Sequence, residues 1–218
     1  MSDIIMKYLW LAVFLIIWCV VHSAMISVHF TDYVKSKFGR KFRFYRLFFN
    51  VVAAASLTPL GLYAYSMQSQ PIFHWEGYLR ICQIIMLVIV VLLFFAGARH
   101  YSILQLLGIR QLKEGILYNV LNEHTELDTT GILGVIRHPW YAAVIVLIWA
   151  RSLDASAILV NVIFTGYLVI GSFLEEQKLI LEFGEKYREY QRKVSMFVPY
   201  KWLKKGADND GDLYQAGP

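Results

Sequence analysis

The sequence predicts an all-α, polytopic membrane protein with about five transmembrane helices, and three observations support that fold class. Hydrophobic residues occupy 57% of the 218 positions and charged residues only 17%, whereas soluble domains carry about 25% charged residues. The hydrophobic residues fall in long blocks without charge, as membrane-spanning helices require. The lysines and arginines lie almost entirely between alternate blocks. The composition therefore disfavours a soluble fold, and the long apolar blocks exclude a disordered, collagen-like or disulfide-stapled chain.

Three blocks are long enough to cross a membrane by themselves. They cover residues 8–28, 47–66 and 81–98, and none contains an Asp, Glu, Lys or Arg. A transmembrane helix needs about 20 apolar residues to cross a hydrocarbon core of about 30 Å. The first block is not a cleaved signal peptide, because it is too long and no small-residue cleavage site follows it.

Two further blocks, residues 139–150 and 155–174, predict a tight helical hairpin. We expect the turn with Arg151 and Asp154 at a membrane interface, since burying either charge at mid-membrane costs about 2.5–3.5 kcal/mol. The first arm of 12 residues is about 18 Å of helix. We therefore expect it to extend to residues before Pro139.

The basic residues predict the orientation. Six lie between the first two spans, four between the third and fourth, and eight after Glu176, while only Lys7, Arg80 and Arg151 remain for the other side. The positive-inside rule then puts the amino terminus outside and the carboxyl terminus in the cytoplasm. We expect an integral protein of a bacterial inner membrane, in contact with anionic lipid and not with nucleic acid.

This topology suggests three regions. Residues 1–98 form an N-terminal three-span region. Residues 99–205 form a catalytic region with a cytoplasmic loop, the hairpin and a cytoplasmic amphipathic C-terminal helix over residues 176–194. Residues 206–218 form a disordered tail rich in Gly and Asp. The helix over 176–194 either lies on the membrane surface or belongs to a site. Cys19 and Cys82 lie inside apolar blocks, which favours packed thiols over a disulfide or a metal site.

The segment 127–141 is the most informative part of the chain. Thr129 or Thr130 could cap a helix that Pro139 then breaks, because proline removes a backbone donor. A broken helix at the membrane boundary is tolerated where it lines a polar cavity.

Arg137, His138 and Tyr141 would gather at that cavity, within one turn of each other. They offer a cation, a titratable ring and a phenol. The alternative is that Arg137 and Trp140 only anchor the chain at the lipid interface.

A longer run of residues resembles a known group of enzymes. Arg137-His138-Pro139-Trp140-Tyr141, then Glu175-Glu176, then Phe183-Gly184 with Tyr187 and Tyr190 follow in this order. This combination resembles the integral-membrane methyltransferases of the isoprenylcysteine carboxyl methyltransferase and phospholipid methyltransferase group. The first half adds His22-Ser23, then Tyr45-Arg46-Leu47 with Asn50, Ser56 and Pro59. These residues are similar to the NnrU-like branch, which includes methanethiol S-methyltransferases.

The resemblance implies an enzyme that uses S-adenosylmethionine to methylate a small thiol or another lipophilic acceptor. It implies catalytic roles for His138, Tyr141 and Arg137. It implies a cofactor site formed by Gly131, Arg137, His138, Pro139, Tyr141, Glu175 and Glu176. A phospholipid or an isoprenylcysteine is the alternative acceptor.

Two other classes of function remain open from the residues alone. A haem or quinone redox protein would use His22, His29, His100 and His138 near the membrane surfaces, since facing helices commonly supply axial ligands. A non-enzymatic membrane scaffold would need neither Arg137 nor the two glutamates.

Overall fold

The structure is a computed structural model that describes residues 2–100, 103–114 and 127–204. The described residues are helical apart from turns and two isolated bridges, which confirms the all-α fold class. The tail expected at 206–218 lies outside them. In chain order the helices are α1 (Ser2–Met25), α2 (Val28–Phe38), η1 (Gly39–Phe44), α3 (Tyr45–Ser66), α4 (Leu79–Ala98), α5 (Ile103–Leu106), α6 (Ile109–Glu114), η2 (Gly131–Gly134), α7 (Pro139–Trp149), α8 (Ala155–Phe183) and α9 (Glu185–Lys193).

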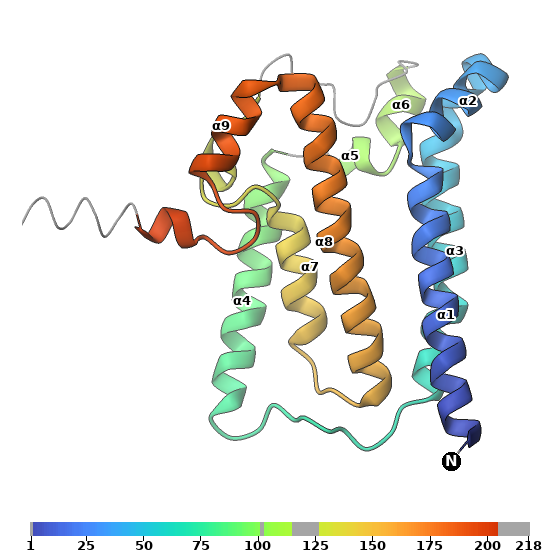
Figure 1. The fold of residues 1–218 in the computed structure, drawn as a ribbon, viewed down its shortest axis with the longest axis vertical. Coiled ribbons are helices and arrows are strands. Elements are labelled where there is room, and N and C mark those ends of the chain that lie inside the picture. Colours follow the sequence, from blue (N-terminus) through green and yellow to red (C-terminus); the bar gives the residue numbers. More distant parts are fainter. Residues whose placement is uncertain (1, 101–102, 115–126, 205–218) are drawn as a thin grey trace, which may run out of the picture.

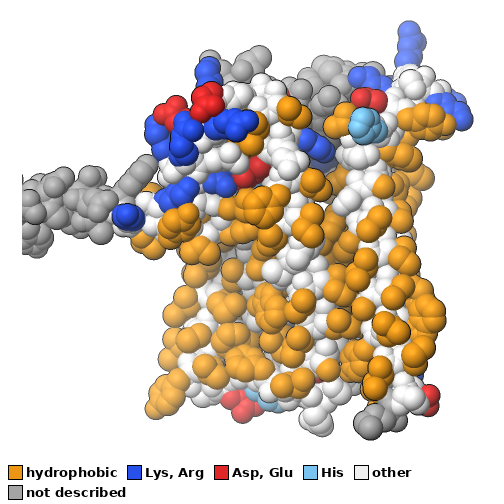
Figure 2. All heavy atoms as spheres, viewed as in Figure 1, with side chains coloured by type: hydrophobic (Ala, Val, Ile, Leu, Met, Phe, Trp, Pro, Cys, Tyr) orange, Lys and Arg blue, Asp and Glu red, His pale blue; other side chains and the backbone are white. Residues whose placement is uncertain are grey.

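The predicted membrane spans are confirmed as helices. α1, α3, α4 and α8 belong to segments long and apolar enough to cross a membrane, and α7 is a shorter apolar helix. These five helices stand side by side, and the chain enters them from alternate ends (Figure 1). Hydrophobic side chains cover the bundle along its length, and the basic residues gather at the end that carries α2 and α9 (Figure 2). The bundle therefore has one strongly charged end.

The C-terminal helix differs from the expected single helix over 176–194. α8 continues past Glu175 and Glu176 to Phe183, and the chain then breaks at Gly184, whose φ is +59°. Glycine adopts this conformation without the steric cost that a Cβ brings. The break turns α9 back against the end of α8. The predicted amphipathic helix is thus two helices.

The apolar stripe predicted over 179–194 is buried inside the protein and does not lie on a membrane surface. Tyr187, Tyr190 and Val194 are less than a tenth exposed and pack with Leu179 and Phe183. Aromatic residues of this size bury a large apolar area. The surface-helix interpretation is therefore wrong for this face of α9, and the stripe instead holds α9 to α8.

Pro139 begins a helix and does not break one. It occupies the first turn of α7, where its missing N–H needs no partner, and His138 before it has a non-helical backbone. The residues between Thr130 and His138 form only the short η2 turn, with no side-chain cap at Thr130. The expected extension of this arm before Pro139 is consequently wrong, and α7 has 11 residues.

The turn between α7 and α8 is closed by the connection between α3 and α4. Phe73 and Leu153 exchange backbone hydrogen bonds of 3.0 and 2.9 Å. Asp154 caps α8 by accepting from Ala157 N at 2.7 Å, and it accepts from Ser69 N at 3.0 Å. Arg151 is exposed. The charged turn therefore lies at an end of the bundle, and its position at a membrane interface stays a prediction.

We predict that Asp154→Ala destabilises the protein by about 1–2 kcal/mol, because it removes the α8 cap and the bond to Ser69. Asp154→Asn is the matched control, since an amide oxygen still accepts from Ala157 N. Thermal unfolding in detergent measures both variants. Equal melting temperatures for the alanine and asparagine variants would contradict the capping role.

Candidate functional site

Glu176 of α8 is the centre of the polar cluster. Arg137 Nε donates to its Oε1 at 2.6 Å, and His138 Nε2 lies 3.1 Å from the same oxygen. Gln191 Nε2 of α9 donates to Oε2 at 2.6 Å. Only 5% of the Glu176 side chain is exposed. Both carboxylate oxygens are therefore occupied, and a buried ion pair joins α8 to the segment before α7.

Arg137 also binds the segment that follows α9. Its guanidinium donates to the carbonyl oxygens of Val194 and Gln191. Its backbone N–H donates to Ser195 O at 2.9 Å, and the N–H of His138 donates to Met196 O at 3.1 Å. Planar guanidinium groups suit such multiple bonding. Arg137 thus connects Glu176 on α8 with the end of α9 and the segment that follows it.

A second, more open group of polar atoms lies beside this ion pair. Tyr141 OH donates to Glu175 Oε2 at 2.9 Å, and the rings of Tyr141 and His138 are parallel with their centroids 5.5 Å apart. His138 Nδ1 lies 3.9 Å from Glu175 Oε2, too far for a hydrogen bond. The Glu175 side chain is 26% exposed. The two adjacent glutamates therefore differ: Glu176 is enclosed and Glu175 is accessible.

The other end of the segment 127–138 is held by an interaction of His100 with Asp128. His100 Nδ1 and Asp128 Oδ2 are 2.7 Å apart, and Asp128 Oδ1 accepts from Thr130 N at 2.9 Å. Burial acts in the opposite direction, but the hydrogen bonds from Thr130 and His100 lower the pKa of Asp128 to about 2. The carboxylate is therefore ionised at neutral pH.

Gly131 makes room for this interaction. Its φ is +52°, and a Cβ placed on it would lie 2.8 Å from His100 Nε2. A side chain at this position would be strained and would displace the imidazole. The structure thus gives Gly131 a steric role next to His100.

Five of the predicted site residues come together in the structure: Arg137, His138, Tyr141, Glu175 and Glu176. Pro139 is fully buried at the start of α7, and its side chain has no polar atom. Gly131 lies apart from these five, against His100.

Sequence reasoning missed Gln191 and the role of the segment 194–196. It also missed the pairing of His100 with Asp128, although an Asp two residues before a Thr is a recognisable turn signal. No sequence signal pointed to Gln191.

The histidines considered for a redox cofactor lie in different surroundings. His22 Nδ1 bonds to Tyr167 OH at 2.7 Å, whereas His100 pairs with Asp128 and His138 with Glu176. Each of these three histidines therefore already binds a side chain of the protein through one ring nitrogen.

Comparison with known proteins points to one family. The sequence profile of the family described as "NnrU protein" matches residues 10–195. Methanethiol S-methyltransferase of Pseudomonas sp. (strain GM41(2012)) is 37% identical over 73 residues, 33% of this chain and 28% of that protein. Methanethiol S-methyltransferase 2 of Bradyrhizobium diazoefficiens is 26% identical over 137 residues, 62% of this chain and 48% of that protein. The chain therefore matches about a quarter to a half of the length of these relatives. No solved structure matches the chain.

We predict that Glu176→Ala destabilises the protein by about 3–5 kcal/mol, because it leaves the Arg137 guanidinium buried without its counter-charge. Glu175→Ala is the matched control on the adjacent position and should cost less than about 1 kcal/mol. The double variant Arg137→Met with Glu176→Ala should recover part of the loss. Thermal unfolding in detergent measures all three. Equal destabilisation by the two glutamate substitutions would contradict this role for Glu176.

We also predict a pH dependence from Asp128. Its folded pKa of about 2 lies below its usual value of 3.8, so its ionised form stabilises the fold above about pH 4. That contribution is lost as the pH falls from 4 to 2. The difference in melting temperature between wild type and Asp128→Asn should be largest above pH 4 and should shrink towards pH 2. A constant difference across this window would refute the prediction.

Proposed function

Since this chain belongs to the NnrU family, whose profile covers residues 10–195, we propose that it is a membrane-embedded methyltransferase that uses S-adenosylmethionine to methylate a small thiol. The relatives named methanethiol S-methyltransferase support the reaction and the acceptor. The observation that carries the proposal is the polar cluster of His138, Tyr141 and Glu175 at the end of an apolar bundle.

The residues of the cluster fit the chemistry of this cofactor. S-adenosylmethionine carries an ammonium group and ribose hydroxyls, which need acceptors, and a carboxylate, which needs donors. Glu175 is an accessible carboxylate, and Tyr141 OH can both donate and accept. We propose that Glu175, Tyr141 and His138 contact the cofactor. When bound, the cofactor supplies an electrophilic methyl group.

Arg137 and Glu176 have a different role in this proposal. They bind each other and are almost fully enclosed, with side chains 8% and 5% exposed. Pro139 fixes the start of α7, and Gly131 fixes the loop through His100. We propose that these four residues position the reacting groups, because methyl transfer depends on aligning donor and acceptor at a short distance.

His138 is suited to accept the proton of the thiol. An ionised carboxylate can only accept a hydrogen bond, so the contact of 3.1 Å with Glu176 Oε1 places the ring hydrogen of neutral His138 on Nε2. Nδ1 is then the basic nitrogen, on the side of Tyr141 and Glu175. A thiol is a far weaker nucleophile than a thiolate. His138 Nδ1 would accept the thiol proton, and the resulting thiolate would attack the methyl group that the bound cofactor supplies.

We further propose the orientation in the membrane. The basic end of the bundle, which holds α2 and α9, would face the cytoplasm of a bacterial cell, with the amino terminus outside. Residues 1–98 would form a supporting region and residues 99–205 the catalytic region. The site would then lie at the cytoplasmic end, where a soluble cofactor is available, while a lipophilic acceptor arrives through the bilayer.

We predict that membranes containing this chain convert methanethiol to dimethyl sulfide when S-adenosylmethionine is supplied. Headspace gas chromatography measures the product, and membranes from cells without the chain are the control. Labelled methyl groups that appear in phosphatidylethanolamine, with no dimethyl sulfide, would reject a thiol acceptor and favour lipid methylation.

We predict that His138→Ala lowers turnover at least tenfold at pH 7, as expected for the loss of a general base. The loss should become smaller as the pH rises, because more of the thiol is then ionised without help. Rates of dimethyl sulfide formation from pH 6.5 to 9.5 test this. A deficit that stays the same at every pH would assign His138 a binding role alone.

A further inference from the structure

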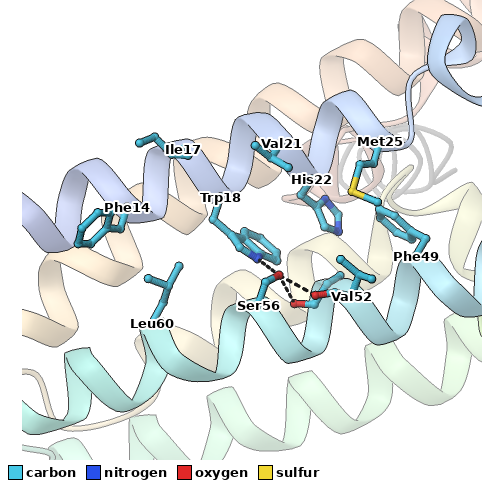
Figure 3. Close-up of a pocket in the computed structure, with 11 residues that line it drawn as sticks. Phe14, Ile17, Trp18, Val21, His22, Met25, Phe49, Val52, Ser56 and Leu60 are labelled. Carbon is cyan, nitrogen blue, oxygen red and sulfur yellow. Dashed lines mark hydrogen bonds between the residues drawn. The ribbon is translucent and has the colours of Figure 1, made fainter.

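A separate cavity lies between α1 and α3, inside the membrane-spanning part of the bundle. It has a volume of about 310 Å³ and is lined mainly by apolar side chains. It is open on one side, where Phe14, Ile17 and Val21 are about half exposed. Figure 3 shows residues of both helices around it, with His22 and Trp18 pointing from α1 towards α3. Ligand sites for small molecules typically have volumes of about 300–1,000 Å³. The cavity is therefore large enough for a ring compound and far larger than a small thiol needs.

The polar atoms of the cavity wall are mostly occupied by the protein itself. Trp18 Nε1 donates to Ser56 Oγ at 3.0 Å, and Ser56 Oγ donates to Val52 O at 2.6 Å (Figure 3). His22 Nδ1 bonds to Tyr167 OH at 2.7 Å. In the described part of the chain, no hydrogen bond reaches His22 Nε2. This nitrogen is therefore the polar atom that the cavity offers to a ligand.

The hydrogen-bond chain favours one tautomer of His22. Ser23 Oγ donates to Tyr167 OH at 3.4 Å, which leaves the single phenolic hydrogen of Tyr167 for His22 Nδ1. With Tyr167 as the donor, a neutral imidazole carries its hydrogen on Nε2. In this arrangement His22 presents an N–H donor, and an acceptor satisfies it.

Two aromatic side chains lie against the His22 ring, one stacked on it and one tilted. Trp18 stacks on the ring with a centroid distance of 4.7 Å and an interplanar angle of 27°. Phe49 lies against it at 4.8 Å. Together with Phe14, these side chains form the aromatic part of a lining that is otherwise mainly aliphatic. Aromatic rings prefer offset-stacked and edge-to-face neighbours, so the wall suits a flat ring.

We propose that this cavity binds a lipid-soluble quinone, with one ring carbonyl oxygen accepting the Nε2 hydrogen of His22. A quinone combines the required features: a flat ring, an acceptor oxygen and a tail that keeps it in the bilayer beside α1 and α3. A lipid acyl chain fills apolar space but has no acceptor for this hydrogen. The quinone is bound here and undergoes no reaction in this proposal, which is independent of methyl transfer.

The cavity is also separate from the methyltransferase site. Tyr167 and Glu176 lie nine positions apart on α8, a rise of about 13 Å. The lining residues belong to α1 and α3, whereas the cluster around Glu176 comes from α7, α8 and α9. A ligand at His22 therefore does not occupy the reacting groups.

Tryptophan fluorescence of the purified full chain in dodecyl maltoside tests the proposal, with decylubiquinone as the probe, because a quinone quenches a tryptophan that it contacts. We expect a saturable quenching component in the wild type. It should be lost in Trp18→Phe and retained in Trp10→Phe, the matched control on α1 outside the cavity. His22→Leu should raise the dissociation constant at least tenfold. Quenching that is linear in quinone and identical in all variants would overturn the proposal.

A second pair of variants avoids dependence on the stability of the His22 substitution. Ala53 lines the cavity and makes no side-chain hydrogen bond, so Ala53→Leu should block binding by filling the space. Ala54→Leu, at the adjacent exposed position, should bind like the wild type. Decylbenzene, which has the same tail and no carbonyl, should not compete. Equal competition by decylbenzene or by dioleoylphosphatidylcholine would reduce the cavity to a lipid-filled space. Loss of thiol methylation in Ala53→Leu would show that the cavity holds the methyl acceptor and would overturn the proposal.

Discussion

The arrangement of the site depends on one buried ion pair, between Arg137 and Glu176. Removing two charges from water costs several kcal/mol, and the cost is offset only when every polar atom finds a partner. Here His138 and Gln191 complete the coordination of Glu176, and backbone oxygens complete that of Arg137. Three separate parts of the chain, residues 137–138, Glu176 and the segment 191–194, must therefore be in place at once. This requirement orients the imidazole of His138 without any regular secondary structure before Pro139.

Adjacent residues of the polar cluster have different roles. Glu176 faces inward and is fully bonded, while Glu175 lies one position earlier on α8 and is accessible. Consecutive residues on a helix point about 100° apart, so one carboxylate can hold the fold while the next meets a ligand. The segment 127–138 is held at both ends. The pairing of His100 with Asp128 holds one end, and the bonds of Arg137 hold the other.

The parts of the fold that hydropathy determines could be predicted, and the parts that tertiary contacts determine could not. The uncharged blocks predict both ends of α3, α4 and α7 to within two residues, because lipid exposure leaves little freedom in where such helices end. The first block is less accurate, since α1 begins six residues before it. The end of α8 was placed too early, since Glu175 and Glu176 resemble an interface in sequence but are bonded to α7 and its preceding segment. Pro139 was expected to interrupt a helix, and only the contacts of residues 136–138 with 195–196 explain why none precedes it. No sequence pattern predicts the role of Gln191, because its contact with Glu176 exists only after the break at Gly184 turns α9 back against α8.

The short α7 has a consequence for the membrane as a barrier. Its 11 residues rise about 16 Å, roughly half of a hydrocarbon core of about 30 Å. One of its ends meets the charged groups at Glu176 and the other meets the turn at Asp154. Protons and ions are kept from passing between these two ends by about half the usual insulating thickness. The barrier here must then come from tight, dry packing. Ala143 on α7 is completely buried, and Trp140 packs against Gly97 on α4. A low permeability to protons and ions therefore requires close packing around α7, independently of catalysis.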